Sequence, residues 1–176
     1  INAAPTGGTG GATAFIGCGL TNSVDLDITH GAGEQALTLN TDIWDTDGFH
    51  DTGSNTNRVT IPAGLGGKYL VTVNARWSAD PGRAYVICRK QTAAQIVLFA
   101  IQNNDSNEWV SSGSAIVDMA AGDYLGFKAL LVNDVNIEAT TSDYGPMVTV
   151  VKLDSGKVGQ GIGAKVYNST TQSVTG

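Results

Sequence analysis

A two-residue alternation of apolar and polar side chains is the feature that most constrains the fold of this chain. Within Val71–Trp77, Val, Val, Ala and Trp alternate with Thr, Asn and Arg, and Val24–Ile28 alternates in the same way. This period is that of a β-strand with one buried and one solvated face. No window long enough for a helix shows an apolar stripe with caps. Together with these two segments, eight further strand-like runs predict ten strands: Ala36–Leu39, Arg58–Pro62, Arg83–Lys90, Gln95–Ile101, Ser112–Met119, Tyr124–Val132, Val135–Thr140 and Met147–Leu153.

Residues typical of turns separate these runs. Asp47-Gly48, Ala63-Gly64, Gly122-Asp123 and Gly145-Pro146 each supply a residue that accepts turn backbone angles at little cost. Many short strands joined by turns are typical of a sandwich or a jelly roll. We therefore predict an all-β fold.

The 176 residues divide into three stretches. Ile1–Gly19 contains Gly7–Gly11, a run that is four-fifths glycine, and has too few large apolar residues to form a core, so we predict a flexible arm. Residues 20–153 form the predicted jelly-roll domain, and residues 154–176 a linker and C-terminal tail. Because the chain starts without Met and without a signal peptide, we expect a processed product.

The charge balance and the length of the apolar runs argue against two classes of partner. With 16 acidic and 10 basic residues, the net charge is −6. Nucleic-acid binding requires clustered Lys and Arg to neutralise phosphates, so we expect no nucleic-acid partner. No apolar run approaches the roughly 20 residues of a membrane-spanning helix, so we expect no membrane partner either.

The chain has two cysteines, Cys18 and Cys88. Cys88 lies within an apolar run and is interpreted as a small buried hydrophobic residue. The two cysteines could form a disulfide with each other, but we favour two free thiols.

Two histidines, His30 and His50, are the first candidates for catalysis. They are 20 residues apart and have no neighbouring Cys or His, so the spacing of a zinc site is missing. The members of a Ser-His-Asp triad are distant in sequence, so a triad stays open, but the chain has no Gly-x-Ser-x-Gly motif. We interpret both histidines as surface or turn residues and expect no enzyme.

Three acids, Asp45, Asp47 and Asp51, are the candidate metal ligands. Their spacing supplies the oxygen-rich environment that Ca²⁺ prefers. The calcium-loop pattern fails, however, since Phe49 occupies a ligand position and no Glu closes the loop. We favour a turn in which Gly48 has a positive φ and the Asp side chains accept hydrogen bonds from nearby amides, with no cofactor.

Trp109 is the candidate ligand-binding residue. It follows the polar segment Asn103–Glu108, so we expect it to be the most exposed of the aromatic candidates for stacking on a sugar. Other strand aromatics, such as Trp44 and Tyr85, are more typical of a core or an interface.

Several segments in order resemble a known family. These are Ile43–Asp51 (IWDTDGFHD), Asn57–Gly64 (NRVTIPAG), Gly67–Val71 (GKYLV), Gly113–Leu125 and Tyr144–Val150. Together they resemble the jelly-roll domain of complement component 1q and tumour necrosis factor, in the version found in phage and bacterial surface proteins. No collagen-like Gly-X-Y repeat precedes the domain, so collagen-stalked members are a poor guide.

The resemblance implies a ten-strand jelly roll that assembles as a homotrimer, with a structural or binding role and no catalysis. We expect the trimer to form through an apolar sheet edge and the strands around Tyr124–Val132 and Met147–Leu153. The end of the chain, Gly163–Gly176, resembles the segment that opens another such module. Either the polypeptide continues, or this segment pairs with a neighbouring subunit.

From these expectations we predict a non-enzymatic structural protein of a phage virion. It would be a capsid decoration protein or a module of a tail fibre or spike, with other virion proteins as partners of the N-terminal arm. The alternative is a carbohydrate- or host-receptor-binding module of a phage or bacterial surface protein, which would use Trp109 to bind a surface glycan. A hydrolase built around His30 or His50 is the third hypothesis.

Overall fold

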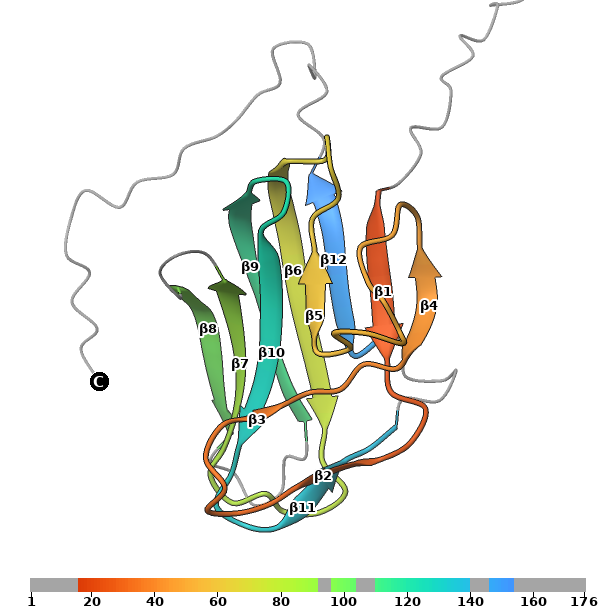
Figure 1. Cartoon of the computed structure of the whole chain (residues 1–176). Coiled ribbons are helices and arrows are strands. Elements are labelled where there is room, and N and C mark those ends of the chain that lie inside the picture. Colours follow the sequence, from red (N-terminus) through yellow and green to blue (C-terminus); the bar gives the residue numbers. More distant parts are fainter. Residues whose placement is uncertain (1–15, 92–95, 104–109, 140–145, 154–176) are drawn as a thin grey trace, which may run out of the picture.

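The computed structural model describes residues 16–91, 96–103, 110–139 and 146–153. In these residues the chain is all-β and contains no helix, and so no helix that could span a membrane (Figure 1). Twelve strands are present in the described part: β1 (Gly17–Thr21), β2 (Leu26–Ile28), β3 (Gln35–Ala36), β4 (Thr41–Asp45), β5 (Arg58–Thr60), β6 (Gly67–Arg76), β7 (Ala84–Gln91), β8 (Ile96–Asn103), β9 (Val110–Met119), β10 (Tyr124–Leu130), β11 (Val135–Ile137) and β12 (Val148–Leu153).

Two antiparallel sheets stack face to face. The first sheet has the order β4-β1-β12-β6-β9. The second has the order β3-β10-β7-β8, with β5 also paired to β10. Figure 1 shows the second sheet in front of the first, with the small β11-β2 pair at one end. Strands that are adjacent in a sheet are often distant in sequence, which is the connectivity of a jelly roll.

The alternating pattern predicts the two faces of β6 correctly. Along β6, Tyr69, Val71, Val73 and Ala75 are fully buried, and the residues between them face outward. β6 lies between β12 and β9, and its inward residues are part of the hydrophobic core.

The predicted number of ten strands is wrong, because β1 and β4 are missing from it. The β1 sequence is GCGLT and the β4 sequence is TDIWD. Glycines and acids disfavour strands locally, and both strands are held by pairing partners from elsewhere in the chain. β1 pairs with β12 on one side and with β4 on the other.

β1 begins at Gly17, inside the range assigned to the N-terminal arm. Gly17, Cys18 and Gly19 pair with Val151, Val150 and Thr149 of β12, so these three residues are part of the sheet. Residues 1–15 and the tail from 154 lie outside the described residues.

Large side chains fill the space between the two sheets. Trp77 is fully buried, and its Nε1–H donates to Ser111 Oγ at 3.0 Å. Phe49 meets Tyr69 edge to face, with ring centroids 6.0 Å apart. Cys18 and Cys88 are both buried free thiols, as predicted.

Candidate functional site

The acidic turn after β4 is organised by a single carboxylate. Asp45 Oδ1 accepts hydrogen bonds from the backbone N–H groups of Asp47, Gly48 and Phe49, and Asp45 Oδ2 accepts one from His50 N at 2.9 Å. Gly48 has a φ of 77°. The carboxylate therefore fixes the turn and satisfies four amides that would otherwise lack partners.

Asp47 and Asp51 also form local hydrogen bonds. Asp47 Oδ2 accepts from the Thr46 hydroxyl, and Asp51 Oδ1 accepts from the amides of Gly53 and Ser54. No group of three or more His, Cys, Asp or Glu side chains suited to a metal occurs among the described residues. These contacts are those of the turn that we favour, and calcium binding stays a prediction to be tested.

Of the two interpretations of His50, as a surface or a turn residue, burial of its side chain excludes the first. Its side chain is fully buried, with Nδ1 2.7 Å from Asp42 Oδ1 and Nε2 3.2 Å from the Thr56 carbonyl oxygen. The sequence does not reveal this burial, because the loop before β5 folds over the ring. A catalytic base needs one ring nitrogen facing a nucleophile, and here a carbonyl occupies that position. The His50–Asp42 pair therefore ties β4 to the following loop, and nothing in the described residues points to catalysis.

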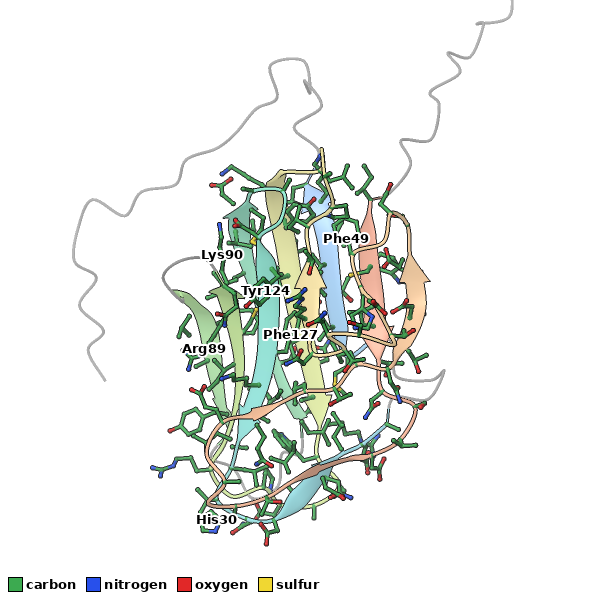
Figure 2. All side chains as sticks on the ribbon, in the orientation of Figure 1. His30, Phe49, Arg89, Lys90, Tyr124 and Phe127 are labelled. Atoms are coloured by element: carbon green, nitrogen blue, oxygen red, sulfur yellow. The ribbon has the colours of Figure 1, made fainter. Side chains whose placement is uncertain are left out.

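The other predicted positions do not converge on a site. His30 is exposed, as predicted, and lies at the β2-β11 end, whereas Phe49, the neighbour of His50, lies far from it (Figure 2). Trp109 lies outside the described residues.

The outer face of the first sheet carries apolar and hydroxyl side chains in register. Across β9, β6 and β12, Ile116, Leu70 and Val151 form one cross-strand row. The next row consists of Ser114, Thr72 and Thr149. We call these six residues the assembly face. Ile116 is 65% exposed and lies at the end of the apolar row, on the edge strand β9.

Charged residues flank the assembly face but do not enter it. At one end Lys68 pairs with Asp118 at 2.6 Å, and beyond the other end Arg76 pairs with Glu138 at 2.6 Å. The two rows between these ion pairs contain no charged residue, and depletion of charge is a feature of interface cores.

A tryptophan extends this face over β1. Gly19 pairs with Trp44, and a Cβ placed on Gly19 would lie 2.4 Å from Trp44 Nε1. The neighbouring Cys18 and Leu20 point into the core, so the indole covers the outward side of Gly19. Position 19 therefore admits no side chain while Trp44 keeps this place.

The strands of the predicted interface lie in different sheets. The sequence predicts an interface from an apolar sheet edge and the strands around Tyr124–Val132 and Met147–Leu153, and the structure places β10 in the second sheet and β12 in the first. The outward residues of β10 include Tyr124, Gly126 and Lys128, which do not form an apolar surface. Alternation shows which residues share a face of a strand, but it does not show which strands share a sheet.

Comparison with known proteins supports the fold. No protein-family profile matches the chain, and no curated protein sequence is significantly similar to it. Among solved structures, the globular domain of zebrafish complement 1qA protein aligns over 77% of this chain and 92% of its own, with a TM-score of 0.52 and 14% identity. The chain has a complement 1q/tumour necrosis factor-like jelly-roll fold.

Two further structures agree with this assignment. Murine APRIL at pH 8.0 aligns over 79% of this chain and 98% of its own, with a TM-score of 0.57 and 12% identity. Eiger TNF from S. frugiperda aligns over 90% of this chain and 98% of its own, with a TM-score of 0.51 and 17% identity. The jelly roll predicted from the sequence segments is therefore confirmed at the level of the fold.

Proposed function

We propose that this jelly roll is a non-enzymatic homotrimeric assembly unit of a phage virion. It acts as a capsid decoration protein or as a module of a tail fibre or spike, on the particle surface. The observation that carries the proposal is the assembly face, an uncharged and partly exposed surface on three adjacent strands of the first sheet.

The occupant of the assembly face is a second copy of this chain, and three copies close the ring. The resemblance to the complement 1q and tumour necrosis factor jelly roll implies a homotrimer, and the fold comparison supports that resemblance. Burial of Ile116, Leu70 and Val151 between copies would remove apolar surface from water without stranding a charge.

The virion role rests on the sequence segments that resemble phage and bacterial surface proteins. In this proposal the N-terminal arm binds other virion proteins, while the jelly roll supplies the rigid trimer. The arm can gain order on binding because a glycine-rich segment is costly to order alone.

The test is to locate the protein on intact particles by electron microscopy and then to remove the arm. The sequence assigns Ile1–Gly19 to the arm, but a deletion through Gly19 would remove paired residues of β1. The deletion therefore ends at residue 15. A trimer that folds but no longer attaches supports the proposal, whereas undiminished attachment moves the docking surface onto the jelly roll.

The second candidate function is a carbohydrate- or host-receptor-binding module. It is favoured by the polar outer face of the second sheet, which contains a pocket lined by Arg, Tyr and amide side chains. Our initial candidate for glycan binding was Trp109. Sugar-array binding that disappears in Trp109→Ala would support that residue, and binding that survives would direct attention to the second sheet.

A further inference from the structure

A hollow of about 310 Å³ lies on the outer face of the second sheet, between β5, β10 and β7. This volume falls at the lower end of the range of about 300–1,000 Å³ for small-molecule sites. Figure 2 shows Tyr124 on β10 and Arg89 on the neighbouring β7, both in the sheet that faces the viewer. The side chains that line the hollow are mostly polar: Asn55, Asn57, Arg58, Gln91, Tyr124 and Lys128.

The hollow exists because the central strand has a glycine at position 126. Gly126 pairs with Arg58 of β5 on one side and with Arg89 of β7 on the other, so a position without a side chain separates two long ones. We call this space the Gly126 pocket.

The backbone does not require glycine at this position. Gly126 is absent from the residues with positive φ, and a Cβ placed there would lie 3.7 Å from its nearest neighbour, Gln91 Nε2. This distance is an ordinary van der Waals contact. Glycine in a strand interior costs stability relative to residues with side chains, so Gly126 leaves open a space that a more stabilising residue would fill.

Arg58 supplies the free positive charge of the pocket. Lys68, Arg76, Lys90 and Lys128 each lie within 3.2 Å of a carboxylate, and Arg89 also pairs with one. Arg58 has no carboxylate partner among the described residues. A half-buried arginine without an acidic partner is unexpected in a chain with a net charge of −6.

Tyr124 orients the guanidinium of Arg58. The Arg58 Cζ atom lies 4.8 Å from the centroid of the Tyr124 ring. Stacking on a ring uses the face of the guanidinium and leaves its N–H donors at the edge free. The arginine is therefore held in place while its hydrogen-bond donors remain available to a ligand.

The lining selects one class of ligand. A guanidinium edge matches a carboxylate with two parallel hydrogen bonds. The amides of Asn55, Asn57 and Gln91 each offer donors and acceptors, which suit sugar hydroxyls. We propose that the Gly126 pocket binds a carboxylate-bearing sugar unit, of the uronic acid type, from an acidic polysaccharide.

This site goes beyond the proposed assembly role and does not depend on it. The Gly126 pocket lies on the second sheet, and the assembly face lies on the outer side of the first. A trimer and a monomer would both present the pocket, so failure of sugar binding would leave the assembly proposal intact.

The test uses the full chain and isothermal titration with a glucuronate-containing tetrasaccharide. The control ligand is the same tetrasaccharide with its carboxylates reduced to hydroxymethyl groups. We expect the acidic sugar to bind, and Arg58→Gln to weaken binding by about 10- to 100-fold, as loss of a charge-assisted hydrogen bond implies.

Two further variants separate binding from stability. Gly126→Val should abolish binding while the melting temperature stays constant or rises, since the new side chain fills empty space on a strand. Arg83→Gln is the matched control, because Arg83 is an exposed arginine that lines a different hollow and has no ion pair in the described part of the chain. It changes the net charge equally and should leave binding unchanged.

Each of several results would overturn the proposal. These are no binding of the acidic sugar to the wild-type chain, equal binding of the carboxyl-reduced sugar, and unchanged binding in both Arg58→Gln and Gly126→Val. Equal affinity for acetate or for a polyglutamate peptide would also overturn it, because the site would then recognise a carboxylate alone or an acidic peptide.

Discussion

The outer faces of the two sheets differ in composition, although the inner faces of both sheets consist of buried apolar side chains. The assembly face on the first sheet combines Ile116, Leu70 and Val151 with hydroxyl residues. The outer face of the second sheet carries Arg58, Tyr124 and other polar side chains. Core packing constrains only the inner faces, so this difference reflects what each outer face contacts. An uncharged face suits another copy of the chain, and a polar pocketed face suits a ligand from solution.

The largest expected effect comes from placing a charge on the assembly face. Ile116→Glu should convert the trimer to a monomer at micromolar concentration, because a carboxylate buried between copies has no partner. The monomer should keep its fold, since Ile116 does not contribute to the core. Sedimentation velocity and circular dichroism measure the two effects.

The second sheet offers a matched control for this substitution. Val97 on β8 is 46% exposed and pairs with Arg89, so it lies on the outer face of the second sheet. Val97→Glu should leave the trimer intact. If both variants dissociate, or neither does, the assembly face is not the interface.

Gly19 and Gly126, which lie on the outer faces of the first and the second sheet, allow a direct comparison of the two faces. Gly19 is covered by Trp44, whereas Gly126 faces open space. Gly19→Ala should destabilise the chain by about 1–3 kcal/mol through overpacking, which corresponds to a decrease in melting temperature of several degrees. Gly126→Ala should cause no decrease. Equal melting temperatures for the two variants would contradict the role of the indole.

The sequence predicts the inward face of β6 better than it predicts the outer face of the second sheet. The inward residues of β6 follow from alternation, and the turn at Gly48 follows from the Asp-Gly pair. The Arg58–Gly126–Arg89 row does not, because its three members come from strands that meet only in the folded sheet. A glycine in the middle of the run Tyr124–Val132 was the available signal, and we interpreted that run as an interface strand.

Substitution of Asp45 tests the stability of the turn that leads from the first sheet into the second. Asp45→Asn keeps one oxygen but replaces Oδ2, the acceptor of the His50 amide, so we expect a loss of about 1–2 kcal/mol in the free energy of unfolding. Urea denaturation measures it. Asp80→Asn, which alters a turn carboxylate that accepts one amide hydrogen bond from Gly82, is the control and should cost less.

Addition of calcium tests whether the same turn binds a metal ion. Because Asp45 and Asp51 already accept backbone hydrogen bonds, we expect millimolar Ca²⁺ to leave the melting temperature nearly constant. Binding to the folded state alone would raise it by mass action. A rise of several degrees that Asp47→Asn abolishes would replace our turn interpretation with a metal site.

Alkaline pH tests the burial of the two thiols, one in each sheet. Burial raises the pKa of Cys88 on β7 from 9.0 to about 12, and burial also raises the pKa of Cys18 on β1, with Asp45 and Asp42 adding to it. The unfolded chain loses its thiol protons near pH 9, while the folded chain retains them. The free energy of unfolding should therefore fall as the pH rises from about 9 to about 12.

Substitution of both thiols should reduce that loss. The double variant Cys18→Ala, Cys88→Ala should retain only the part due to Tyr69, whose pKa burial raises to about 12. Denaturant titrations at stepped pH measure the difference. Thiols that react with a disulfide reagent in the native chain at pH 8 would show that these side chains are not buried.

The native mass of the wild-type chain tests the central claim most directly. Sedimentation equilibrium at micromolar concentration should give three times the chain mass of 18.1 kDa, with slower amide exchange at Leu70, Ile116 and Val151 in the trimer than in the Ile116→Glu monomer. A mass of a single chain in the wild type would contradict the account, and the uncharged face of the first sheet would then need another occupant.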